Sequence, residues 1–244
     1  MENGQTRQRL PRPVGALILL MTAAAVAIAV VRSLDLTKWN GHDAIAFGGL
    51  ALGIALAEQF TVPVRFRTET LNVSPTEGLW IAALVLARPS VLALAVGLGI
   101  LAGHAFRRWA THKVAFNTGQ FLLALTAAQA VFRSLHPHGA AHPWTWFAAG
   151  LSMAAYAAVN ATLVALVIAL AEGRPFLAVL MPPLPANAAH FVGNTAIGLG
   201  GAMLWSASPY LFPVVLVPLA AAFVIYRVLL RSAHRRDHVG VVAA

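Results

Sequence analysis

The stretch Lys113–Phe132, KVAFNTGQFLLALTAAQAVF, decides the class of the fold. After Lys113 it carries no charged residue, and at about 1.5 Å per residue a helix of this length nearly crosses the ~30 Å hydrocarbon core of a bilayer. It also carries three carboxamides, Asn117, Gln120 and Gln129. Amides in a membrane helix are costly without a partner, so they usually face other helices or a cavity. We therefore expect this helix to lie inside a membrane bundle.

The composition of the whole chain supports an integral membrane protein. Of 244 residues, 59% are hydrophobic and 10% are charged, well below the charged share of about 25% in soluble domains. The net charge of +9 does not indicate nucleic-acid binding, because the basic residues fall in short clusters beside apolar runs. The absence of cysteine excludes disulfides, thiolate metal sites and cysteine nucleophiles.

The apolar runs predict eight transmembrane helices, at about 14–31, 44–60, 75–87, 91–106, 114–132, 152–171, 186–206 and 209–230. A basic head, 1–13, precedes them and a short basic tail, 233–244, follows. The first run is longer than the 7–15-residue core of a signal peptide, so we expect it to remain as a span. The sequence thus predicts an all-α, polytopic helical membrane bundle.

Two segments depart from a simple succession of spans. Residues 61–73 alternate apolar and polar side chains, which predicts a short extended segment at the membrane surface. Ser74, Pro75 and Glu77 then form a capping-box pattern that starts the short third helix. The uncharged run from Pro143 is too long for one untilted span, so we expect a surface turn before a helix that begins at about Ser152.

Glycines in the second and fourth spans predict close helix packing. Gly49 and Gly53 have a GxxxG spacing, and Gly97, Gly99 and Gly103 follow in the fourth span. His104, in the last turn of the fourth span, is expected to snorkel to the interface or to cap the helix.

The distribution of positive charge predicts the orientation. Thirteen of the 17 Lys and Arg residues fall on the side that holds both termini, whereas Arg32, Lys38, Arg88 and Arg133 fall on the other. The positive-inside rule therefore predicts cytoplasmic termini, in a multi-pass protein of a bacterial plasma membrane. Its basic loops are expected to contact anionic lipids.

With this orientation, polar residues of several spans gather in the cytoplasmic leaflet. Asn187, His190 and Asn194 share one face of the seventh span. We expect a polar cluster, or a small ligand cavity open to the cytoplasm, built by spans five, six and seven. The alternative is a set of interhelical hydrogen bonds that fix packing only. The candidate residues are Asn117, Gln120, Asn160, Asn187, His190, Asn194 and Glu58.

No pattern indicates catalysis or a cofactor. The sequence contains no HExxH, GxSxG or P-loop motif, and we expect the protein not to be an enzyme. His136, His138 and His142 lie within seven residues and could bind a metal, but no carboxylate lies nearby. A polar loop without a metal is the expectation.

Five stretches together carry a family resemblance. They are LAEQF at 56–60, the Ser74-capped short helix, RRW with a following Lys at 107–113, FNTGQFLLA at 116–124 and NATLVALVIALAEGRP at 160–175. Over about residues 44–232 the chain resembles the bacterial multi-span sensor module found ahead of GGDEF diguanylate cyclase and HD-GYP phosphohydrolase domains. The resemblance implies that the module senses a signal in or at the membrane and passes it through its last helix.

The sequence departs from that family after Arg236, where eight residues leave no room for an output domain. Cyclic-dinucleotide chemistry is therefore not expected. We expect a stand-alone sensor-type or small-ligand-binding module that signals to a separate protein partner. The alternatives are a membrane component of a small-solute transporter and a structural membrane subunit.

Overall fold

The computed structural model describes residues 10–211 except 61, 67–68 and 74–75. The basic tail and all but the first residues of the predicted eighth span lie outside the described residues, as does most of the basic head. The helices are α1 (Arg12–Ser33), α2 (Gly41–Ala57), α3 (Thr76–Leu86), α4 (Pro89–Phe106), α5 (Thr111–Ser134), α6 (Pro143–Glu172), α7 (Phe176–Leu180) and α8 (Leu184–Ala207). Three short 3-10 turns are η1 (Leu36–Lys38), η2 (Glu58–Phe60) and η3 (Pro209–Leu211).

Local sequence signals account for several helix ends. The Asn40 side chain accepts a hydrogen bond from the Asp43 backbone N–H, and the Asp43 carboxylate accepts one from the Asn40 N–H, so a capping box starts α2. Pro89 stands in the first turn of α4. Gly173, with a φ of 66°, adopts the left-handed conformation that ends α6.

Five of the described helices are long and apolar enough to cross a membrane: α1 with η1, α2 with η2, α4, α5 and α6. Their outer faces expose large apolar side chains, such as Leu19, Ile45 and Phe106, as a lipid-facing surface does. Helix α3, with 11 residues, is about 16 Å long and too short to cross alone. In α8, Asn187, His190 and Asn194 lower the mean hydropathy, and this helix is not among the five.

The prediction for α6 is wrong at its start. Instead of a surface turn followed by a helix from about Ser152, a single helix of 30 residues begins at Pro143. The His142 Nδ1 accepts a hydrogen bond from the Trp144 backbone N–H, and Pro143 occupies the first turn. Because of these two features, the helix begins directly after His142. At about 1.5 Å per residue it is longer than the hydrocarbon core is thick.

The segment predicted to be extended forms an antiparallel hairpin of β1 (Val62–Phe66) and β2 (Glu69–Val73), with Val64 opposite Leu71. The alternating pattern at 61–73 thus correctly indicated strand structure. In the part of the chain that the structure describes, the hairpin is the sole strand structure.

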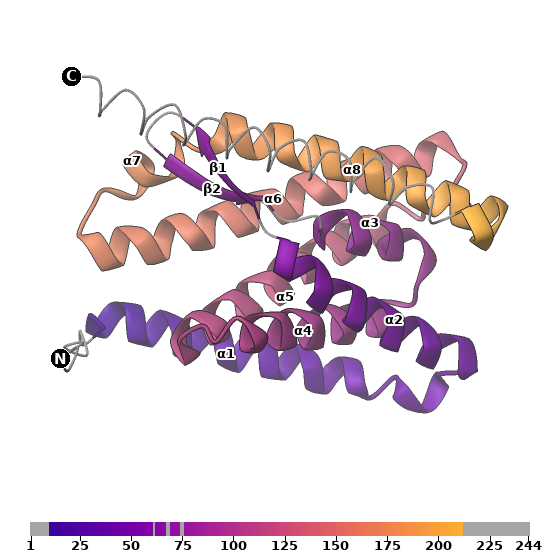
Figure 1. Ribbon diagram of the computed structural model, residues 1–244, viewed down its shortest axis with the longest axis horizontal. Coiled ribbons are helices and arrows are strands. Elements are labelled where there is room, and N and C mark those ends of the chain that lie inside the picture. The colour runs from indigo at the N-terminus through magenta and orange to yellow at the C-terminus, as the bar shows by residue number, and fades with distance from the viewer. Residues whose placement is uncertain (1–9, 61, 67–68, 74–75, 212–244) are drawn as a thin grey trace, which may run out of the picture.

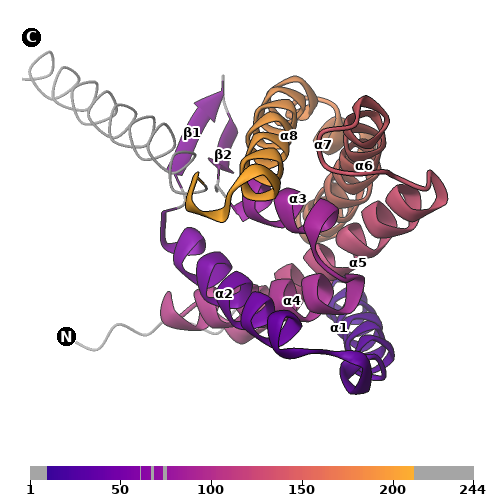
Figure 2. The same cartoon turned by 90° about the vertical axis from the view of Figure 1, so that its right-hand side faces the viewer.

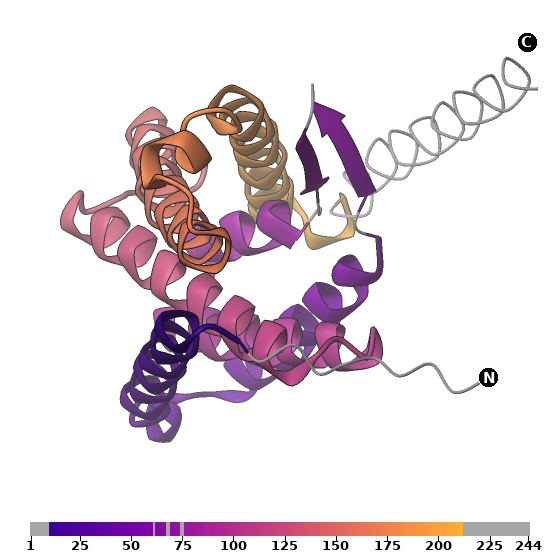
Figure 3. The ribbon, with the colours of Figure 1, turned by 90° about the vertical axis from the view of Figure 1, so that its left-hand side faces the viewer.

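The helices form two groups (Figures 1 and 2). Helices α1, α2 and α4 pack together with α5, and α8 packs with α6 and α3. The contact between α5 and α6 joins the groups on one side, and α3 lies between α2 and α8 on the other. We call the end at which α1 begins and the hairpin lies the hairpin end; Figure 3 views the bundle from it. The other end holds the α3–α4 and α5–α6 connections.

Glycines allow α2 and α4 to approach closely. A Cβ added at Gly99 would lie 2.7 Å from Ile54 Cβ, and one at Gly103 would lie 2.8 Å from Glu58 Cβ. The predicted close packing at these two positions is confirmed. It is wrong at Gly49, which has no atom within 4 Å of its added Cβ. The GxxxG pattern of α2 therefore does not form a helix contact at that position.

Candidate functional site

The first turn of α3 places two consecutive buried polar side chains between the helix groups. Thr76 is 1% exposed and Glu77 is 8% exposed. The Thr76 hydroxyl donates a hydrogen bond of 2.8 Å to Glu58 Oε1 in η2. The Glu77 carboxylate lies on the α8 side instead, 3.5 Å from His190 Nε2. Adjacent residues of one short helix thus contact opposite groups of the bundle.

Glu58 also pairs with His104 of α4. The Glu58 Oε2 to His104 Nε2 distance is 3.3 Å, and both side chains are buried. The His104 ring stacks on Trp109, with 4.3 Å between centroids. Within the described residues His104 Nδ1 has no hydrogen-bond partner, so a neutral ring that donates from Nε2 to Glu58 leaves no buried N–H unpaired. The predicted snorkelling or capping role of His104 is replaced by a buried pair.

Glu77, His190 and Asn194 form a second polar group, between α3 and α8. Asn194 Nδ2 lies 3.1 Å from His190 Nε2 and 3.2 Å from His190 Nδ1. A neutral His190 can accept this amide N–H, whereas a protonated ring has no lone pair left to accept it and is drawn to the Glu77 carboxylate. A change of charge at His190 therefore changes which partner it favours. We call Thr76 and Glu77, with Glu58, His104, His190 and Asn194, the α3 clasp.

Buried polar atoms without a partner lie beside the clasp. Glu77 Oε2, Trp80 Nε1 and the Tyr156 hydroxyl form no hydrogen bond in the part of the chain that the structure describes. The Trp80 and Tyr156 rings are 4.6 Å apart, and Tyr156 also contacts Phe191 at 5.8 Å. Nearly all buried polar groups in proteins have a partner. The arrangement therefore offers one acceptor and two donors to a water molecule or a polar ligand.

The candidate residues predicted from the sequence are divided among separate contacts. Glu58, His190 and Asn194 belong to the clasp. Gln120 of α5 donates a hydrogen bond to Asn160 Oδ1 of α6, within the contact that joins the two groups. Asn117 is half-buried and forms no hydrogen bond with a described residue. Asn187 lies on α8, one to two turns from His190 and Asn194; the contacts of its side chain lie outside what the structure describes.

Sequence reasoning missed Thr76, Glu77 and Tyr156 as site residues and assigned His104 an interfacial role. Glu77 had a sufficient local explanation as the last residue of a capping box, so its burial was not expected. The sequence did contain a signal for this site: Glu58, Glu77, His104 and His190 all lie in or beside apolar segments. Acidic and histidine side chains are rare in membrane segments unless they pair with one another.

The described residues contain no group of three His, Cys, Asp or Glu that could hold a metal ion. In the histidine-rich loop, the rings of His138 and His142 lie 4.7 Å apart, and His136 Nδ1 lies 3.0 Å from the Ser134 carbonyl oxygen. The clasp chemistry is that of carboxylate and imidazole groups, which can hold or move a proton and bind polar ligands.

No protein-family model, curated protein or solved structure matches this chain.

Proposed function

We propose that this chain is a sensor-type module of a bacterial plasma membrane that binds a small polar ligand at the α3 clasp. The bound ligand changes how the clasp holds the two helix groups, and the change is passed to a separate protein partner. The observation that carries the proposal is the opposite attachment of Thr76, to Glu58, and Glu77, to His190.

The clasp has the properties that a ligand-controlled contact requires. It lies between the two helix groups on the side opposite the α5–α6 contact. Its Glu77 Oε2 has no hydrogen-bond partner among the described residues and lies 3.5 Å from His190 Nε2, so a ligand N–H or O–H group that binds there competes only with that longer contact. A ligand that favours one arrangement of the clasp shifts the equilibrium toward that arrangement by its difference in affinity.

The charge distribution supports placing the hairpin end in the cytoplasm. Arg107, Arg108, Lys113 and Arg174 lie at helix ends there, as the positive-inside rule requires of cytoplasmic loops. These residues and the hairpin form the surface that we assign to a protein partner and to anionic lipid headgroups.

A thermal-shift screen of small metabolites on the purified protein in an uncharged detergent tests the proposal. A compound that raises the melting temperature of the unchanged protein and of Glu172→Gln, but not of Glu77→Gln, supports a ligand at the clasp. Glu172 is the matched control because it is exposed and pairs with Arg174 outside the clasp, at 3.1 Å. A compound that is moved across sealed vesicles by the reconstituted protein would favour the transporter alternative instead.

A further inference from the structure

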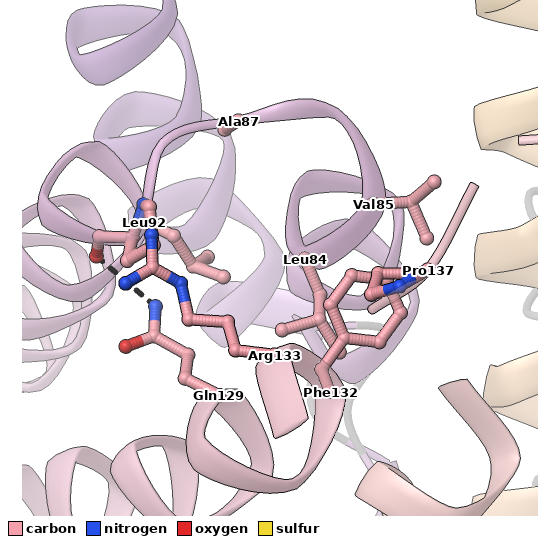
Figure 4. Close-up of a pocket in the computed structure, with 9 residues that line it drawn as sticks. Leu84, Val85, Ala87, Leu92, Gln129, Phe132, Arg133 and Pro137 are labelled. Carbon is pink, nitrogen blue, oxygen red and sulfur yellow. Dashed lines mark hydrogen bonds between the residues drawn. The ribbon is translucent and has the colours of Figure 1, made fainter. Parts of the chain in front are cut away.

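The opposite end of the bundle contains a cavity of about 200 Å³ between the end of α3, the start of α4 and the end of α5. Figure 4 shows Arg133 and Gln129 on one side of this space and the apolar side chains of Leu84, Phe132 and Pro137 on the other. An apolar cavity of ~150 Å³ is large enough for benzene. The cavity is therefore large enough for a small organic molecule with one polar group.

The polar side of the cavity is held in place. Gln129 is 2% exposed. Its Oε1 accepts a hydrogen bond of 2.9 Å from Arg32 Nη2, and its Nε2 donates one of 3.0 Å to the Pro89 carbonyl oxygen. Both ends of the Gln129 amide are thus hydrogen-bonded, and Arg32 is not among the residues that line the cavity.

This end also has an excess of positive charge beside the cavity. The two carboxylates of the described residues at this end are engaged by other partners: Asp35 by Lys38 at 2.9 Å, and Asp43 by Arg88 at 3.1 Å. Arg32 and Arg133 remain without an acidic partner in ion-pair contact among the described residues, and their charges repel one another. An anion in the cavity beside Arg133 would relieve this repulsion.

We infer that this cavity binds a small organic carboxylate, with its carboxylate group against the guanidinium group of Arg133 and its apolar body against Leu84, Leu92 and Phe132. Arginine suits this task because its N–H groups match the two oxygens of a carboxylate. The exposed Arg133 leaves the polar side accessible from solvent. The site is independent of the clasp and of the proposed function, because it lies at the other end of the bundle.

Titration of 4-fluorobenzoate, followed by ¹⁹F NMR on the full chain in phosphatidylcholine nanodiscs, tests this inference. The neutral isostere 4-fluorobenzamide is titrated in parallel. The expected result is binding of the acid at least about tenfold tighter than of the amide, because a charge-assisted hydrogen bond is stronger than a neutral one. Equal binding of acid and amide, or no binding of the acid, would overturn the inference.

Variants locate the site. Arg133→Gln should remove most of the preference for the acid, and Ala87→Phe, which adds a ring to the cavity wall, should weaken binding of both compounds. Arg88→Gln is the matched control, because Arg88 lies at the same end but pairs with Asp43; it should leave binding unchanged. An effect of Arg88→Gln as large as that of Arg133→Gln would show a general surface potential and overturn the inference. The inference would also fail if added phosphatidylglycerol displaced the acid equally from the unchanged protein and from the Arg133→Gln variant.

Discussion

The two ends of the bundle differ in where their charged side chains lie. At the hairpin end, Glu58 and Glu77 are buried inside the packed helices and each has a histidine within 3.5 Å. At the opposite end, Arg133 lies at a helix end with access to solvent, and the deeply buried Gln129 carries no charge. A buried carboxylate depends on its partner, whereas a guanidinium at a helix end does not. Stability should therefore depend more on the charged groups of the hairpin end than on those of the opposite end.

The largest effect should come from His104→Ala. The substitution leaves the buried Glu58 carboxylate with Thr76 but without its imidazole partner, and it opens a hollow under Trp109. Loss of one member of a buried pair costs about 3 kcal/mol. The decrease in the free energy of unfolding is measured by titrating sodium dodecyl sulfate into the protein in uncharged micelles. His42→Ala, at an exposed position of α2, should change the free energy of unfolding by less than about 0.5 kcal/mol; equal effects would remove the contrast between buried and exposed histidines.

Gly103→Ala should be the next most damaging change. Its added Cβ would lie 2.8 Å from Glu58 Cβ and 3.2 Å from the Ala55 carbonyl oxygen, so α2 and α4 must separate. Overpacking of this kind costs about 2 kcal/mol, measured in the same unfolding titration. Gly49→Ala is the control, because nothing lies near its added Cβ, and it should be neutral or stabilising. A neutral Gly103→Ala would show that the α2–α4 contact tolerates the separation.

Gln129→Leu tests the polar side of the opposite end. It removes both the acceptor for Arg32 and the donor to the Pro89 carbonyl. Because Arg32 can turn toward solvent, we expect the free energy of unfolding to fall by about 1.5 kcal/mol. This decrease is smaller than the one expected for His104→Ala. Ser134→Ala, whose hydroxyl bonds only within its own helix at this end, is the control. A loss for Gln129→Leu above that for His104→Ala would reverse the assignment of stability to the hairpin end.

Among the four test substitutions, Gln120→Leu, in the contact between α5 and α6, should have the smallest effect. It loses the hydrogen bond to Asn160, and interhelical bonds of this kind average about 0.6 kcal/mol in membrane bundles. Asn117→Leu, one turn away and without a hydrogen bond to a described residue, should cost less still in the same titration. A loss above about 2 kcal/mol for Gln120→Leu would show that this amide supports a larger network.

Sequence patterns predicted the helices better than they predicted the partners of the polar residues. The fourth span was expected at 91–106 and the helix is Pro89–Phe106, because a long apolar run bounded by polar residues has few alternatives in a membrane. The start of α6 was missed because an uncharged run does not mark where its helix begins; the cap at His142 does. The eight-span count and the cytoplasmic termini stay predictions.

The pairing of Glu58 with His104 could not be predicted, for a physical reason. It depends on the rotation of α2 against α4, and that rotation is set by the room that Gly99 and Gly103 leave. Likewise, Glu77 fits a capping pattern in the sequence, and that pattern gives no sign of its contact with His190 of α8, which forms only once α3 is packed. Single residues of the site were visible in the sequence, whereas their combination required the fold.

We propose that the first turn of α3 holds the two helix groups together. The distance between spin labels at Phe106→Cys on α4 and Val192→Cys on α8 measures it directly, because both sites are exposed and the chain has no native cysteine. Replacement of Thr76 by Val together with Glu77 by Gln should lengthen and broaden this distance in nanodiscs, while a control pair at Leu20 and Phe106, within one group, stays unchanged. An unchanged distance between Phe106 and Val192 would contradict the claim and leave the clasp as a packing contact.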